Sequence, residues 1–142
     1  AVFGPDSGQR GSKQEMKSKH NSAHTLKGGK GLTRILNSTR YSMQGFKAAF
    51  INEAAFRQLV LINVILIPIA CGLDVTPAER AILISAPLLS LAIELLNSAI
   101  ENLVDRVSME LHPLSKHAKD MGSAAQFVGL VIISVCWFVI LI

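Results

Sequence analysis

The chain has 142 residues; half are hydrophobic, 14 are Lys or Arg and 10 are Asp or Glu, which gives a formal net charge of +4. Its apolar residues gather in three long blocks, which argues against a soluble helical bundle. The basic residues lie beside these blocks and lack an aromatic recognition pattern, so they favour lipid head groups over nucleic acid. The two cysteines have no metal-ligand spacing.

The N-terminal third of the chain divides into two parts. Residues 1–30 are rich in Gly, Ser, Lys and His without apolar periodicity, so we expect a disordered extension or a fusion remnant. Over residues 32–50, apolar side chains lie within an arc of about 100°, flanked by Arg40 and Lys47. This pattern predicts an amphipathic helix lying in the membrane interface; a core-facing helix of a soluble domain is the alternative.

Three segments are long and apolar enough to cross a membrane, at about residues 53–73, 78–107 and 119–142. The predicted fold is therefore an all-α membrane protein, with three transmembrane helices preceded by the interfacial helix. Basic residues are concentrated before the first span and in the second loop. This distribution places the N-terminus and the second loop in the cytoplasm, and the first loop and the C-terminus outside.

The second apolar segment carries a stripe of polar residues: Glu94, Asn97, Glu101 and Asp105 fall within an arc of roughly 80° on one helix face. Carboxylates in a membrane helix are costly and indicate a functional site. The alternative is a polar seam that only joins helices. Two acids one or two turns apart suit a divalent cation and proton transfer better than a seam.

Other polar residues flank the spans. Glu53 and Arg57 are spaced for an ordinary intrahelical ion pair, whereas the functional interpretation has Glu53 share a cation with Glu101. His112 and His117 in the second loop fit solvated residues better than metal ligands. Lys119 begins the third span, where its ammonium could meet phosphates that enter from the cytoplasm.

Three motifs in this order carry a resemblance to a known family: Asn52-Glu53-Ala54-Ala55-Phe56-Arg57-Gln58, Glu94 through Arg106, and Ala118-Lys119-Asp120-Met121-Gly122-Ser123-Ala124-Ala125. From about Leu32 to its end the chain resembles the small prokaryotic integral-membrane diacylglycerol kinases. It departs from that pattern at Met43, Phe50 and Gly72, where relatives carry Trp, and at Leu59, where a Glu often stands. These departures concern contacts with lipid.

The resemblance implies a homotrimer in the bacterial inner membrane that phosphorylates diacylglycerol to phosphatidic acid with MgATP at the cytoplasmic face. It implies that Glu94 is the general base and that Glu53 and Glu101 bind Mg²⁺. The nucleotide-binding positions it implies are Arg34, Tyr41, Glu53, Glu101, Glu110, His112, Lys119 and Asp120. The substrate-binding positions it implies are Arg34, Lys47, Glu94, Asn97 and Ser123.

The physical chemistry of phosphoryl transfer agrees with this assignment. The reaction needs positioning and neutralisation of charge, and Mg²⁺ prefers carboxylate and phosphate oxygens. Glu94 lies two turns from Glu101, about 10 Å deeper along the helix, a depth that matches a lipid hydroxyl. Two alternatives stay open: an undecaprenol kinase of the same fold, and a small transporter or channel with an acidic gate. No soluble-kinase signature is present.

Overall fold

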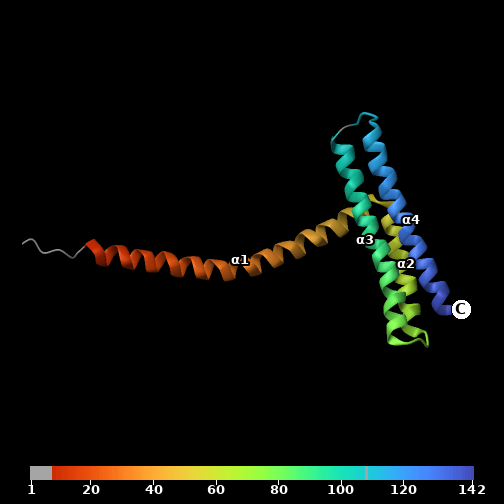
Figure 1. Cartoon of the computed structure of the whole chain (residues 1–142), viewed down its shortest axis with the longest axis horizontal. Coiled ribbons are helices and arrows are strands. Elements are labelled where there is room, and N and C mark those ends of the chain that lie inside the picture. The colour runs from red at the N-terminus through yellow and green to blue at the C-terminus, as the bar shows by residue number, and fades with distance from the viewer. Residues whose placement is uncertain (1–7, 108) are drawn as a thin grey trace, which may run out of the picture. The chain divides into compact units, whose positions relative to one another are not determined.

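The computed structural model describes residues 8–107 and 109–142, with side chains from residue 30 onward. These residues form four helices in chain order, α1 (Gly8–Asn52), α2 (Ala54–Gly72), α3 (Pro77–Val107) and α4 (Pro113–Leu141), and no strand (Figure 1). Helices α2, α3 and α4 have 19, 31 and 29 residues and are long and apolar enough to cross a membrane. The predicted all-α class with three spans preceded by a further helix is confirmed.

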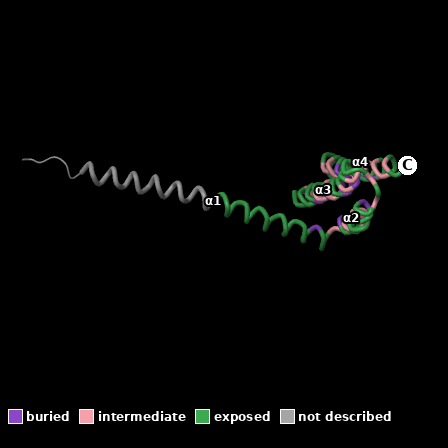
Figure 2. Tube along the Cα trace, turned by 90° about the horizontal axis from the view of Figure 1, so that it is seen from below, coloured by how far each residue is buried: buried purple, intermediate pink, exposed green. Residues whose placement is uncertain are grey.

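Helix α3 is the centre of the packing, because it contacts both α2 and α4. These helices belong to a compact unit formed by the described residues from Phe46 onward, and the described residues up to Gly45 form a second unit. Figure 2 shows that buried positions on the three spans are few and exposed ones many. Ile65, Phe138 and Val139 are 50%, 64% and 68% exposed. Water would make so much exposed apolar surface costly, whereas lipid chains can cover it.

The chain bends between α1 and α2 at Glu53, whose backbone is extended with φ −112° and ψ 112°. The Arg57 guanidinium donates to the carbonyls of Phe50 at 2.9 Å and Ile51 at 3.0 Å. Carbonyls in the last turn of a helix lack helical partners, so Arg57 caps the end of α1. Within the described residues, Arg57 therefore makes these bonds and no ion pair with Glu53.

The loop between α2 and α3 is closed by side chains of the first turn of α3. Glu79 accepts hydrogen bonds from the backbone N–H and the hydroxyl of Thr76, both at 2.8 Å, and the Glu79 N–H donates to the Thr76 hydroxyl. This reciprocal arrangement is a capping box. Arg80 donates to the carbonyls of Ala70 and Leu73 at the end of α2. The first turn of α3 therefore fastens the loop to the end of α2.

A proline in α3 leaves one carbonyl without its helical donor, and a side chain of α4 replaces that donor. Pro87 has no N–H, so it cannot donate to the carbonyl of Leu83 one turn earlier. The Trp137 indole N–H of α4 donates to that carbonyl at 3.2 Å. Asn63 of α2 donates to the carbonyl of Pro87 at 3.1 Å. Since lipid offers no hydrogen bonds, these two contacts hold the three spans in register.

Trp137→Phe is expected to lower the thermal unfolding midpoint, because the Leu83 carbonyl would lose its donor while most of the aromatic packing stays. A hydrogen bond of this kind between membrane helices contributes on the order of 1 kcal/mol. The measurement is thermal unfolding of the purified protein in detergent micelles. Phe127→Leu, which trims an exposed ring on the same helix, is the control. Equal midpoints for Trp137→Phe and the unchanged protein would contradict this role.

Two helix boundaries differ from the sequence prediction. Helix α1 begins at Gly8, whereas we expected disorder up to residue 30 and a helix from Leu32. The sequence of α1 contains no proline that would break the helix. Residues 1–7 lie outside the described residues. Helix α4 begins at Pro113 rather than at residue 119. Pro is favoured in the first turn of a helix, and the His112 side chain caps it by accepting from the Leu114 N–H.

Candidate functional site

The polar stripe of α3 runs from a buried to an exposed position. The side chains of Glu94 and Ser98 are 4% and 5% exposed, Asn97 and Glu101 are half-buried, and Asp105 at the helix end is exposed. The predicted helical face is therefore present in the structure. The stripe leads from the interior of the spans to the exposed end of α3.

A polar seam explains only one half of this face. Nearer the start of α3, Gln126 of α4 donates to the Ser90 hydroxyl at 3.2 Å, and this bond joins two helices. No hydrogen bond or ion pair joins the Glu94 carboxylate to another helix within the described part of the chain. A buried carboxylate without such partners is costly and contributes nothing to helix association. The seam interpretation therefore fits Ser90 and does not fit Glu94.

Two further carboxylates lie near Glu94. Those of Glu53 and Glu101 are close enough to interact electrostatically with it, one from the α1–α2 junction and one from α3 itself. The Asn97 amide donates to Glu101 at 3.3 Å. Among residues 30–107 and 109–142, no group of three or more His, Cys, Asp or Glu side chains forms a complete metal cage. Magnesium commonly uses one or two carboxylates and takes its other ligands from water and phosphate, so this donor set fits Mg²⁺.

Helices α3 and α4 approach each other closely beside this group. A Cβ atom added at Gly122 would collide with the Asn97 side-chain oxygen, so a larger residue there would force the Asn97 side chain to move. That oxygen and the Ser98 hydroxyl are buried without a hydrogen-bond partner. Polar atoms buried without a partner are costly inside a membrane protein. Ser123, which follows Gly122, is exposed.

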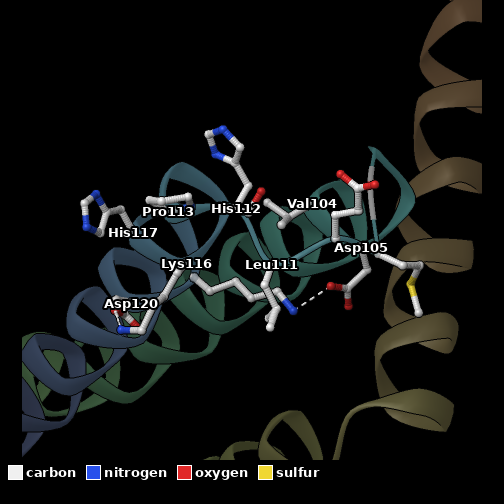
Figure 3. A pocket seen from close by; sticks show the side chains of 12 residues that line it. Val104, Asp105, Leu111, His112, Pro113, Lys116, His117 and Asp120 are labelled. Carbon is white, nitrogen blue, oxygen red and sulfur yellow. Dashed lines mark hydrogen bonds and ion pairs between the residues drawn. The ribbon is translucent and has the colours of Figure 1, made fainter.

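A cavity of about 940 Å³ lies at the end of α3 and the start of α4. Figure 3 shows its walls, with Asp105 on α3, His112 before α4, and Lys116 and Asp120 on α4. The cavity brings together four of the predicted nucleotide-binding residues, which are Glu110, His112, Lys119 and Asp120. Glu110 and His112 come from the loop, and Lys119 and Asp120 come from α4.

Two ion pairs lie in the cavity wall. The Lys119 ammonium contacts the Asp105 carboxylate at 2.5 Å and so links α4 to α3. The Lys116 ammonium contacts Asp120 at 2.7 Å within α4. Sequence reasoning placed Asp105 on the polar stripe but did not give it a partner. The spacing of lysines in α4 does not reveal which of them faces α3.

The remaining predicted residues lie on α1. Arg34 and Tyr41 are exposed in the unit that ends at Gly45, and Lys47 is exposed in the other unit. Their assignment rests on the resemblance alone. By contrast, Glu53, Glu94, Asn97, Glu101 and Lys119 all belong to the unit in which the polar stripe and the cavity lie.

Comparison with known proteins finds similar sequences along most of the chain. The family described as "Prokaryotic diacylglycerol kinase" matches residues 40–141. A "Diacylglycerol kinase" of Pseudomonas aeruginosa is 66% identical over 117 residues, covering 82% of this chain and 95% of the relative. Relatives of the same name are 50% identical in Haemophilus influenzae and 47% identical in Escherichia coli K12. They cover 75% and 78% of this chain, and 91% of each relative is aligned.

Proposed function

The chain belongs to the prokaryotic diacylglycerol kinase family and is a lipid kinase, and we propose that it transfers the γ-phosphoryl group of ATP to diacylglycerol, producing phosphatidic acid. The observation that carries this proposal is the stripe that joins a buried glutamate, Glu94, to a cavity with two lysines at the helix end. The buried end of the stripe, at Glu94, suits the hydroxyl of a lipid. The exposed end, at the cavity with its two lysines, suits a polyphosphate.

In the proposed reaction the lipid binds at the buried end of the stripe and ATP binds at the exposed end. The diacylglycerol hydroxyl oxygen attacks the γ-phosphorus of ATP, and its proton passes to the Glu94 carboxylate. The bond between the γ-phosphorus and the β,γ-bridging oxygen breaks, and its electron pair leaves with ADP. Such transfers depend on alignment and on neutralising the phosphate charge, more than on covalent catalysis by the protein. The buried position of Glu94 keeps water away from the attacking hydroxyl.

The charge of the phosphates requires cations, and the site offers two kinds. Glu53 and Glu101 would hold Mg²⁺, which neutralises phosphate charge when it is bound. The Lys119 ammonium, on the cavity wall, would contact the phosphates directly. The Asn97 amide donates to Glu101 and so orients that carboxylate. Asn97 and Ser123 would lie beside the reacting groups, and Lys47 would contact the lipid. The residues that would contact the nucleotide are Arg34, Tyr41, Glu110, His112 and Asp120.

The setting that we propose is the cytoplasmic face of the bacterial inner membrane. Lys and Arg are in excess before α2 and at the helix ends that flank the α3–α4 loop, where Arg106 lies in the last turn of α3 and Lys116 and Lys119 lie near the start of α4. This excess supports a cytoplasmic N-terminus and an outer C-terminus. In this orientation the cavity faces the compartment that holds ATP, and the first helix would lie in the membrane interface. The resemblance supports a homotrimer.

The test is a phosphorylation assay with purified protein in mixed micelles, labelled ATP and Mg²⁺. Diacylglycerol and undecaprenol are supplied in separate reactions, and labelled lipid is measured. We expect labelled phosphatidic acid and little labelled undecaprenyl phosphate. The reverse preference would assign the undecaprenol kinase activity instead. If neither lipid acquires label from ATP, the whole proposal is contradicted.

Lys119→Ala is expected to raise the KM for ATP by about tenfold or more and to change the KM for diacylglycerol little. The reason is that a charge-assisted contact to phosphate is lost, whereas the lipid binds deeper in the bundle. The alternative is that Lys119 only anchors α4 to lipid head groups. Steady-state kinetics with each substrate varied separately decides between them, because an anchoring role predicts no effect confined to ATP.

A further inference from the structure

We propose that Asp105 is a positioning residue, which holds the Lys119 ammonium in the direction of the metal-bound phosphates. This inference rests on the proposed function, because it takes the cavity as the nucleotide site. The distinctive feature is a carboxylate that belongs to the polar stripe of α3 and yet pairs with a lysine of α4.

The first step of the argument is the position of Asp105 on α3. It follows Glu101 by four residues, so the two carboxylates lie one turn apart, about 6 Å along the same face. Glu101 is one of the two carboxylates that fit Mg²⁺. A cation held at Asp105 therefore lies about one helical turn from the proposed metal position, so one triphosphate could contact both cations.

The second step concerns Lys119, which has two carboxylates in its surroundings. Its ammonium contacts Asp105 at 2.5 Å, and Glu101 is close enough to attract it as well. A free lysine side chain has many rotamers, and ordering it for each binding event costs conformational entropy. The contact with Asp105 selects rotamers that point toward α3. The lysine is therefore ordered before the nucleotide arrives.

The third step is that stability alone is a poor explanation for this pair. The side chains of Lys119 and Asp105 are 41% and 58% exposed. Ion pairs with such exposure contribute little to folding. The neighbouring pair of Lys116 and Asp120 shows that α4 can satisfy a lysine within its own helix. The pair between Lys119 and Asp105 instead crosses to the helix that carries the candidate catalytic residues.

A lysine can serve both partners at once, because an ammonium has three N–H donors. One donor can stay on Asp105 while the others turn to the phosphates. Asp105 thus need not be displaced when the nucleotide binds. The positive charge of Lys119 beside the Asp105 carboxylate also offsets part of the repulsion between that carboxylate and the incoming anion.

The experiment compares Asp105→Asn, Lys119→Ala and the double variant in steady-state assays, in which MgATP and diacylglycerol are varied separately. We expect Asp105→Asn to raise the KM for MgATP about three- to tenfold, the range for one misplaced charged contact. The KM for diacylglycerol should stay within about twofold. Asp74→Asn makes the same chemical change in the exposed α2–α3 loop and should change neither constant. Asp105→Glu keeps a carboxylate and should recover most of the affinity for MgATP.

The double variant separates positioning from an independent role. If Asp105 acts through Lys119, adding Asp105→Asn to Lys119→Ala should change the KM for MgATP no further. Multiplied effects, an unchanged KM or a lowered KM in the Asp105→Asn variant would each overturn the inference. A fall in thermal midpoint accompanied by equal losses for both substrates would do so too, since it indicates a packing role. If the unchanged protein forms no labelled lipid from ATP, the proposed function itself fails.

Discussion

Glu94→Gln is expected to lower kcat for diacylglycerol phosphorylation by about 10²- to 10⁴-fold, the usual effect of removing a general base. Glutamine has nearly the same shape as glutamate and can still form hydrogen bonds, but it does not accept the hydroxyl proton. Because the lipid end of the stripe lies apart from the cavity, MgATP affinity should change little. The measurement combines turnover in mixed micelles with equilibrium binding of a non-hydrolysable ATP analogue.

The stability of the same variant distinguishes a catalytic from a structural role. Glu94 is 4% exposed and has no hydrogen-bonded or ion-paired partner within the described residues. Burying an ionised carboxylate is costly, so replacing it by a neutral amide should leave the thermal midpoint unchanged or raise it. Glu79→Gln makes the same change at the other end of α3, in the capping box, and should retain turnover. Near-normal activity of Glu94→Gln would show that the base is another group.

The fold was predictable because its dominant signals are local. Spans of about 20 apolar residues are visible in the sequence, and the expected limits of 53–73 and 78–107 lie within one residue of α2 (Ala54–Gly72) and α3 (Pro77–Val107). The polar stripe was predictable for the same reason, since residues three or four apart share a helical face. Glu94 and Glu101 could thus be placed on one face before any tertiary contact was known.

Contacts between helices were harder to predict, because they depend on how each helix is rotated against its neighbour. Nothing in the sequence pattern pairs Trp137 with the carbonyl that Pro87 leaves free, or Lys119 with Asp105. The start of α4 was missed because its first turns carry polar residues such as Ser115 and Lys116 and look like a loop. Pro113 was the available signal. Read as the first residue of a helix, it would have shown that Lys116, Lys119 and Asp120 share one helix.

Glu101→Gln and Glu53→Gln are expected to weaken the use of Mg²⁺ and to shift the Mg²⁺ concentration for half-maximal activity upward by about 10- to 100-fold. Each change removes a charged oxygen from the donor set, and Mg²⁺ depends strongly on carboxylate ligands. Direct binding of Mn²⁺, followed by its electron paramagnetic resonance signal, gives a second readout that does not depend on turnover.

The two variants also test different alternatives at their positions. For Glu53 the alternative is an intrahelical ion pair with Arg57. Arg57 already donates to two carbonyls at the end of α1. Arg57→Gln should therefore loosen the α1–α2 junction without moving the Mg²⁺ midpoint.

For Glu101 the alternative is a packing role, yet its carboxylate is half-buried and its one hydrogen-bonding partner within the described residues is the Asn97 amide. A glutamine could keep that bond through its own oxygen, so packing alone predicts little change in Glu101→Gln. Unchanged Mg²⁺ and Mn²⁺ titrations in both variants would therefore remove these carboxylates from the metal site.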